Sequence, residues 1–236
     1  MGGRQSKIPR CPFWLWAKTM ISVISPSIRP EGLKLVEKAL KRQTHTDYEW
    51  LTDTSPEKDE GDYWGVYKAY NRLLKRAKGD LVVSWQDYTY ADPMALEKFW
   101  FHFTQEPKTI VGAVGNKYTD DTFTVLTWQD PREQGLSYQE APWMSIELNL
   151  AAFPMEAFKS VGGFDEYLDK YSSLCGLDVL DRLHLLGGWK FKIDQNIKTY
   201  SLEHGRLPLW DEYTPFNGAY AERRRTYIGK PKLDYL

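Results

Sequence analysis

The sequence predicts an α/β fold in a single domain, with a mostly parallel central sheet flanked by helices. Strand-like apolar runs alternate with segments of helical period through the first hundred residues, and such alternation favours parallel strands joined by right-handed crossovers. The run Leu81-Val82-Val83 is continuously apolar. This is typical of a strand that is buried on both faces inside a parallel sheet.

The first half of the chain gives its strand and helix signals in order. Each strand signal is a run rich in β-branched or aromatic residues, and each helix signal has apolar residues three or four positions apart. The expected elements are a strand at 21–25, a helix from Pro30, a strand at 48–52, a helix at 63–77, a strand at 81–85 and a helix opened by Asp92-Pro93. We expect Asp92 to be the N-cap of that last helix and Pro93 its first residue.

The second half is less regular. The expected elements are strands at 109–114 and 123–127, a buried extended segment at 149–153, a helix at 178–186, and strands at 189–193 and 199–204. No repeat and no Pro/Ser-rich linker interrupts the chain. We therefore expect one domain at 20–205, preceded by a leader at 1–19 and followed by an aromatic and basic tail at 206–236.

Composition excludes several classes of protein. The formal net charge of −1 gives no argument for binding nucleic acid or an anionic membrane surface. Apolar runs are shorter than the roughly 20 residues of a membrane span. Cys11 and Cys175 fit no disulfide or metal framework, which favours a reducing compartment. We expect a cytoplasmic protein, with peripheral attachment to a membrane through 12–16 as the alternative.

Polar residues follow the three predicted parallel strands where each strand ends. They are Pro26-Ser27, Asp53 and Gln86-Asp87. The carboxyl ends of parallel strands share one edge of the sheet, where ligands of open α/β folds bind. Asp87 is thus expected where a nucleotide and a divalent metal would be held. The alternative is that Asp87 and Asp92 are ordinary loop and capping residues.

Several separate motifs, at the spacing expected, resemble family 2 glycosyltransferases with the GT-A fold. They are the strand and loop at 21–33, the second strand and its approach at 43–50, the helix and turn at 71–80, Val161-Gly162-Gly163-Phe164-Asp165-Glu166, and Gly176-Leu177-Asp178. The similarity covers roughly residues 20–205. It implies that a sugar is moved, with inversion, from a nucleoside diphosphate donor to a hydroxyl of a glycan, a lipid-linked molecule or another acceptor.

The resemblance implies that Asp178 is the general base that takes the acceptor hydroxyl proton. The family commonly has Glu directly before this Asp, whereas this chain has Leu177. Local sequence alone also fits Asp178 as a helix N-cap. Trp143, Glu147 and Asn149 could face a sugar.

For the donor, the resemblance implies contacts from Pro26, Ser27, Arg29, Asp53 and Lys78. Gln86-Asp87-Tyr88 stands where the family usually has Asp-x-Asp, so Gln86 and Asp87 would contact the donor and Asp87 would bind Mn²⁺ or Mg²⁺. His204 is the second expected metal or diphosphate ligand. The alternatives are a solvated lysine at a helix end for Lys78 and a surface or core histidine for His204.

Two other functions remain open from the sequence. One is a non-catalytic nucleotide- or carbohydrate-binding module on the same fold, suggested by Leu177 and by the missing second metal carboxylate. The other is a nucleotidyltransferase, although 25–29 is not a Gly-rich phosphate loop. The tail, with Arg223-Arg224-Arg225, is expected to cover the acceptor cleft, to pack on the sheet or to contact a second copy of the chain. We expect no nucleic-acid partner.

Overall fold

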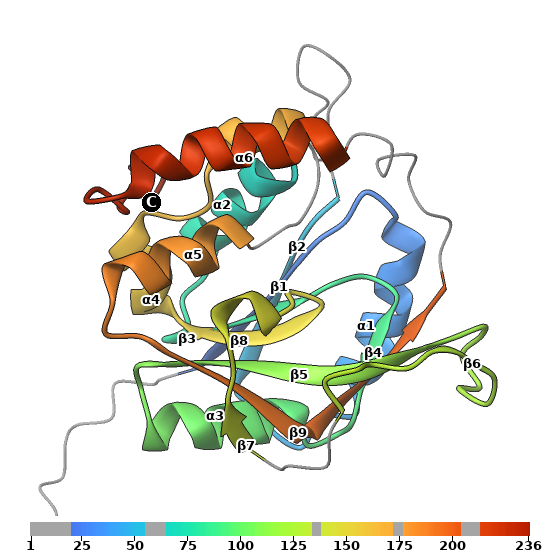
Figure 1. Ribbon diagram of the computed structural model, residues 1–236. Helices are drawn as coiled ribbons and strands as arrows, with labels where there is room; N and C mark the ends of the chain where they lie inside the picture. The colour runs from blue at the N-terminus through green and yellow to red at the C-terminus, as the bar shows by residue number, and fades with distance from the viewer. Residues whose placement is uncertain (1–19, 55–64, 134–137, 172–176, 204–212) are drawn as a thin grey trace, which may run out of the picture.

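The computed structural model describes residues 20–54, 65–133, 138–171, 177–203 and 213–236. A nine-stranded sheet forms its centre, and its main path has the strand order β2-β1-β3-β8-β5-β9-β4 (Figure 1). The strands are β1 (Ile21–Pro26), β2 (Tyr48–Asp53), β3 (Leu81–Trp85), β4 (Thr89–Ala91), β5 (Thr109–Tyr118), β6 (Leu126–Trp128), β7 (Tyr138–Glu140), β8 (Leu150–Pro154) and β9 (Lys190–Leu202). Outside that path, β6 pairs with β5, and β7 pairs with β9.

Most strands of the main path run in one direction. Strands β2, β1 and β3 are parallel, and β5 and β9 are parallel to each other. Strand β8 lies between these two groups and is antiparallel to both β3 and β5, so the two groups point the same way. Strand β4 is antiparallel to β9. The predicted mostly parallel sheet is confirmed.

Helices cover both faces of the sheet (Figure 1). The helices are η1 (Pro30–Gly32), α1 (Leu33–Leu40), α2 (Val66–Arg76), α3 (Ala95–Gln105), η2 (Trp143–Ser145), α4 (Met155–Val161), η3 (Glu166–Tyr171), α5 (Leu177–Leu186) and α6 (Tyr213–Tyr227). Buried side chains of α2, α4 and α5 share one apolar cluster, and those of α1 and α3 share a second. Among the described residues, no helix has the length and apolar character needed to cross a membrane.

Strand β3 is buried on both faces of the sheet, as the sequence predicts. All five of its residues are buried. Val82 joins one apolar cluster while Leu81 and Val83 join the other, because successive strand side chains point to opposite faces. Strand β3 pairs with β1 from Ile21↔Leu81 to Ile24↔Ser84. The carboxyl ends of β1 and β3 therefore lie side by side.

The described part of the C-terminal tail packs on α4, η3 and α5 rather than on the sheet. Arg224 Nε lies 2.5 Å from Asp181 Oδ2, and the Tyr220 hydroxyl donates to the same oxygen at 3.0 Å. Further on, the Leu233 N–H donates to the Val161 carbonyl at 2.9 Å. Gly162 adopts φ +72°, and a Cβ there would lie 1.7 Å from the Leu233 carbonyl oxygen. The absence of a side chain at Gly162 thus leaves room for the backbone of the tail.

Three expected elements differ in the structure. Helix α3 begins at Ala95 after Met94, and the Ala95 N–H donates to the Asp92 carbonyl at 3.0 Å. Asp92 therefore precedes a turn at Pro93 and Met94, and the predictions of Asp92 as N-cap and of Pro93 as the first helical residue are both wrong. The strand expected at 123–127 begins only at Leu126, because Phe123 has φ 55° in a turn. The strands expected at 189–193 and 199–204 form one strand, β9, that is bulged where its register with β5 shifts.

Candidate functional site

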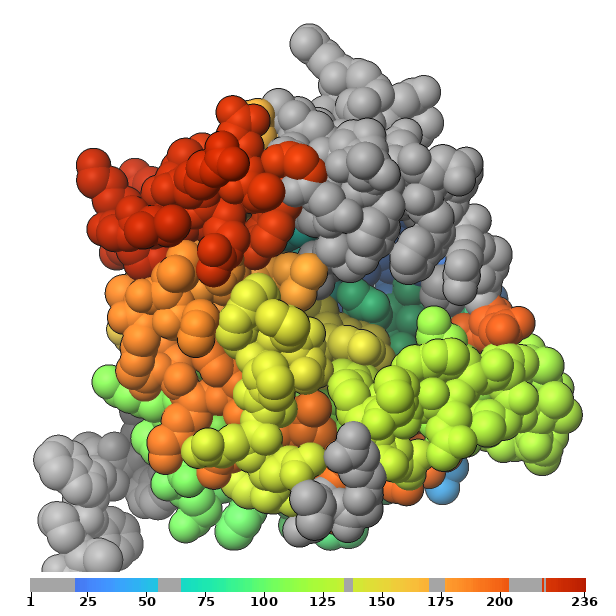
Figure 2. Space-filling view, in the orientation of Figure 1, coloured from blue at the N-terminus to red at the C-terminus, as the bar shows by residue number. Residues whose placement is uncertain are grey.

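A cavity with a volume of about 600 Å³ lies at the carboxyl edge of the sheet. Ligand pockets commonly have volumes of about 300–1,000 Å³. Its lining residues are Gln86, Asp87, Tyr88, Thr89, Lys117, Thr127, Trp128, Glu147, Asn149, Ser201, Leu202 and Glu203. Figure 2 shows a recess between the yellow and yellow-green segments, with teal residues of the first half of the chain in its floor. The cavity therefore lies where open α/β sheets bind ligands.

Ser27, Arg29 and Asp87 form a tight cluster beside this cavity. The Ser27 hydroxyl donates to Asp87 Oδ2 at 2.6 Å, and Arg29 donates from Nη2 to Asp87 Oδ1 at 3.0 Å and from Nε to Oδ2 at 3.3 Å. The Arg29 N–H also donates to the Ser27 hydroxyl at 2.9 Å. Because β1 and β3 are parallel neighbours, the residues that follow them meet, as the sequence predicts.

Asp53 and Pro26 lie one strand further along the same edge. Pro26 pairs with Asp53 in the β1–β2 register, and the Ser27 N–H donates to the Asp53 carbonyl at 2.9 Å. The Asp53 carboxylate accepts a hydrogen bond from Arg72 Nε of α2 at 2.8 Å. The structure thus brings Asp53 to the predicted edge, with its side chain bonded to a helix.

Of three other expected site residues, Gln86 lies in the cavity, Lys78 lies elsewhere, and His204 is not described. Gln86 lines the cavity, and its N–H donates to the Asn149 carbonyl at 3.0 Å. Lys78 precedes β3, and its N–H donates to Glu49 Oε1 at 2.7 Å. It therefore lies at the opposite end of that strand from Asp87, and the structure does not bring it to the site. His204 is outside the described residues.

Asp178 is buried and does not line the cavity. Only 1% of its surface is exposed. Its Oδ2 accepts hydrogen bonds from Arg182 Nη2 at 2.7 Å and from the Asp165 N–H at 3.0 Å, whereas Oδ1 has no partner in the described part of the chain. Burial raises the pKa of Asp178, and Arg182 opposes that shift.

Two expectations for Asp178 are therefore corrected. Asp178 is the second residue of α5, so it is not an N-cap. Its carboxylate instead accepts the Asp165 N–H, and this bond joins the glycine turn to the helix. Asp178 also does not face the crevice in this structure. Tyr227 of α6 helps to enclose this region, since the Arg182 guanidinium lies 5.5 Å from the Tyr227 ring centroid.

Glu147 and Asn149 line the cavity just before β8, whereas Trp143, suggested with them, packs against the apolar cluster of α2, α4 and α5. Arg132 Nη2 lies 3.1 Å from Glu147 Oε2. Lys117, Trp128 and Glu203 also line the cavity, and sequence reasoning did not single them out.

The charges and donor atoms of the cavity fit a divalent cation bound together with an anionic ligand. Asp87, Glu147 and Glu203 oppose Lys117 among the lining residues, so a diphosphate would enter an acidic recess. Mg²⁺ and Mn²⁺ prefer oxygen donors, and Mg²⁺ often binds through one or two carboxylates together with substrate phosphates. In the described residues no three His, Cys, Asp or Glu side chains form a metal-binding group. A cation here would thus depend on oxygens of the ligand.

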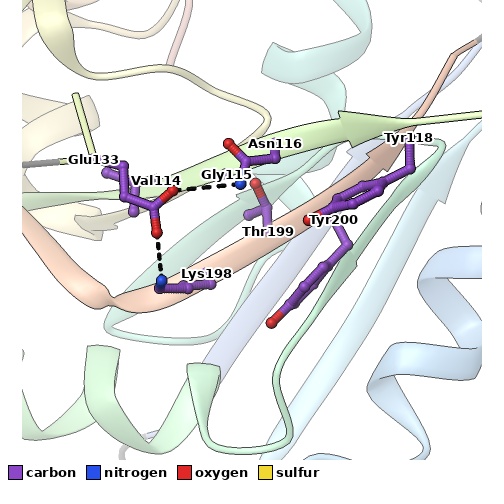
Figure 3. A pocket seen from close by; sticks show the side chains of 8 residues that line it. All are labelled: Val114, Gly115, Asn116, Tyr118, Glu133, Lys198, Thr199 and Tyr200. Carbon is purple, nitrogen blue, oxygen red and sulfur yellow. Dashed lines mark hydrogen bonds and ion pairs between the residues drawn. The ribbon is translucent and has the colours of Figure 1, made fainter. Parts of the chain in front are cut away.

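A second cavity lies between β5 and β9 and has a volume of about 150 Å³ (Figure 3). It is lined by Val114, Gly115, Asn116, Tyr118, Glu133, Lys198, Thr199 and Tyr200. Glu133 pairs with Lys198 and accepts a hydrogen bond from Asn116 Nδ2 at 3.3 Å. This space is too small for a nucleotide-sized ligand.

Comparisons with known proteins show the fold. No protein-family model matches the chain, and no curated protein matches it in sequence. Residues 1–349 of Staphylococcus aureus TarS in complex with UDP-GlcNAc superpose at a TM-score of 0.62 and 14% identity, covering 83% of this chain and 62% of that one. The UDP complex of the same fragment gives 0.60 and 14%, covering 78% and 61%. The longer TarS structure gives 0.60 and 13%, covering 78% and 37%.

The present chain thus spans about three fifths of that TarS fragment. With the sheet order above, these superpositions confirm the predicted fold class, a GT-A type α/β fold with helices on both faces of a mostly parallel sheet.

Proposed function

We propose that the protein is a glycosyltransferase that moves a sugar from a nucleoside diphosphate sugar to an acceptor hydroxyl. The observation that carries the proposal is the polar cavity at the carboxyl edge of the sheet, bordered by Ser27, Arg29 and Asp87. The fold similarity to TarS, which was crystallised with UDP and with UDP-GlcNAc, supports this choice of ligand. We take UDP-GlcNAc as the first donor to test.

The nucleotide would lie over the ends of β1, β2 and β3. Pro26, Ser27 and Asp53 border that part of the edge, with Arg29 and Gln86 nearer to the diphosphate. Arg29 supplies a planar guanidinium, which suits phosphate oxygens. The sugar would then extend toward the start of β8, where Glu147 and Asn149 line the cavity.

Mn²⁺ or Mg²⁺ is part of the proposal. Asp87 would hold the ion together with diphosphate oxygens, and His204 is proposed as a further ligand. When bound, the ion would offset the negative charge that develops on the departing diphosphate. Arg29 would offset part of the same charge from the protein side.

Asp178 is proposed as the general base of an inverting transfer. It would take the acceptor proton while the acceptor oxygen bonds to the anomeric carbon and the bond to the diphosphate breaks. A carboxylate held at one oxygen by Arg182 and free at the other suits this role, as does its raised pKa. Because Asp178 is 1% exposed, an acceptor reaches it only after a neighbouring segment moves.

The burial of Asp178 also favours a second candidate, a module that binds a nucleotide or carbohydrate without turnover. Thermal shift with UDP and UDP-GlcNAc tests ligand binding, since a ligand of the native state raises apparent stability. Release of UDP from UDP-GlcNAc, measured with and without Mn²⁺, separates the two candidates. Stabilisation with no UDP release favours the module, and the absence of any binding contradicts both.

A further inference from the structure

Trp128 presents an aromatic ring to the polar cavity. It ends β6 and lines the cavity with 39% of its surface exposed. Exposing an apolar ring to water is unfavourable, and the same cavity contains the carboxylate of Glu147 and the amide of Asn149. A pyranose ring has an apolar C–H face and a rim of hydroxyls. An aromatic ring can cover that face while carboxylate oxygens accept hydrogen bonds from the hydroxyls.

Trp128 is held by its neighbours rather than left on a loose loop. It pairs with Lys117 across the β5–β6 ladder, and the Lys117 ammonium lies 5.5 Å from its ring centroid. Two residues later, Asp130 is 1% exposed and accepts the Gly115 N–H at 3.0 Å. The backbone on both sides of the ring is therefore fixed to β5.

Arg132 connects this anchor to Glu147. Its Nε donates to Asp130 Oδ1 at 2.8 Å, and its Nη1 donates to the Ser145 carbonyl at 2.8 Å. Its Nη2 also pairs with Glu147 Oε2 at 3.1 Å. One arginine thus places both the hairpin that bears Trp128 and the carboxylate of Glu147.

The strand order separates these groups from the diphosphate side of the cavity. Strands β8 and β5 follow β3 in the order β1-β3-β8-β5. Ser27 and Arg29 follow β1, whereas Trp128 pairs with β5. A ligand with its nucleotide over β1 and β3 would extend its sugar toward Trp128. We propose that Trp128, Glu147 and Asn149 form a subsite for a pyranose ring, with Trp128 as its stacking platform; this rests on the proposed function.

The sugar in this subsite can belong to the donor or to the acceptor. Calorimetry with the full chain tests three probes: UDP, UDP-GlcNAc, and methyl glycosides of common hexoses added in the presence of UDP. The variants are Trp128→Ala and Trp128→Phe. Leu126→Ala is the matched control, because Leu126 lies on the same strand, is 47% exposed and does not line the cavity.

For a donor sugar, Trp128→Ala weakens UDP-GlcNAc roughly tenfold and leaves UDP unchanged, while Trp128→Phe restores most of the affinity. For an acceptor sugar, the roughly tenfold loss falls on the methyl glycoside instead. Unchanged binding of all three probes to Trp128→Ala overturns the subsite while the proposed function stands. If UDP and UDP-GlcNAc both fail to bind the unmodified protein, the proposed function falls and the subsite with it.

Discussion

Arg29 and Asp87, which are 58 residues apart in sequence, form a bidentate ion pair with contacts of 3.0 and 3.3 Å beside the cavity that Asp87 lines. Asp87 is 8% exposed, so Arg29 and Ser27 replace much of the water that would otherwise surround its carboxylate. Buried ion pairs are costly to break from one side, because the remaining charge is left without compensation. The pair therefore links the stability of the β1 and β3 loops to the electrostatics of the proposed donor site.

Replacing Arg29 with Ala is expected to weaken UDP binding roughly ten- to hundredfold, since hydrogen bonds to charged groups contribute about 1.5–3 kcal/mol. Arg29→Lys should give an intermediate affinity, because it keeps the charge and loses the planar fork. Calorimetry measures both. Lys78→Ala is the control, and an equal loss of affinity in that variant would contradict the assignment of the site.

The proposed metal has its own test in Asp87. We expect Mn²⁺ to increase UDP affinity in the unmodified protein, because the cavity is acidic and the ligand is anionic. Asp87→Asn should remove most of that increase while binding of UDP in EDTA changes less. Titrations of UDP with Mn²⁺ or with EDTA measure the difference. An identical Mn²⁺ effect in both proteins would exclude Asp87 as a ligand.

Asp178→Asn is expected to lower sugar transfer by about 10²–10⁴-fold, the usual contribution of a general base, with UDP binding unchanged. The measurement is release of UDP in the presence of acceptor, together with calorimetry of UDP. A structural role through Arg182 and the Asp165 N–H predicts instead a lower unfolding midpoint with turnover per folded molecule retained.

Asp169 predicts a specific pH dependence of stability. Its carboxylate accepts the N–H groups of Tyr67 and Lys68 at the start of α2, at 2.7 and 3.1 Å. Burial nevertheless raises the pKa of Asp169 from its usual 3.8 to about 7. A raised pKa in the folded state means that its contribution to stability is complete below about pH 4 and is lost as pH rises through about 7.

Urea unfolding at several pH values between 4 and 8 tests this dependence. The unmodified protein should lose stability across that window, and Asp169→Asn should show a smaller loss because it has no proton to release. Equal pH slopes in the two proteins would contradict the raised pKa.

The docking of α6 depends on ion pairs with buried carboxylates. Arg223 Nε lies 2.6 Å from Asp165 Oδ2, and Asp165 is fully buried. Arg223→Ala should lower the free energy of unfolding by about 1–3 kcal/mol, because Asp165 loses a charged partner. Arg225→Ala is the control, since Arg225 is exposed, and it should change stability by less than about 0.5 kcal/mol. Equal effects of the two variants in urea unfolding would contradict this role of α6.

Local sequence was enough to predict the first half of the fold and its ligand edge. Strands β1, β2 and β3 follow from their runs of β-branched, aromatic or apolar residues, and their parallel order brings Ser27 near Asp87. The position of Lys78 before β3 already indicates the other end of the sheet. The family resemblance rests on the order of the motifs, and it led instead to the expectation that Lys78 contacts the donor.

The features that were missed depend on contacts between distant segments. Trp128 faces the cavity only because β6 pairs with Lys117 of β5, and no local pattern sets that register. Asp178 is enclosed in part by α6, which begins more than thirty residues later. Its burial therefore depends on tail packing, for which the sequence left three arrangements open.

The bridge formed by Arg132 has a further consequence. This one guanidinium contacts Asp130, the Ser145 carbonyl and Glu147. The distance between the segment after β6 and the segment before β8 is therefore set before any ligand binds. Such preorganisation reduces the conformational entropy that association would otherwise cost. A cavity of fixed width would exclude bulkier sugar rings. Replacing Arg132 with a shorter side chain would then broaden the range of sugars that bind.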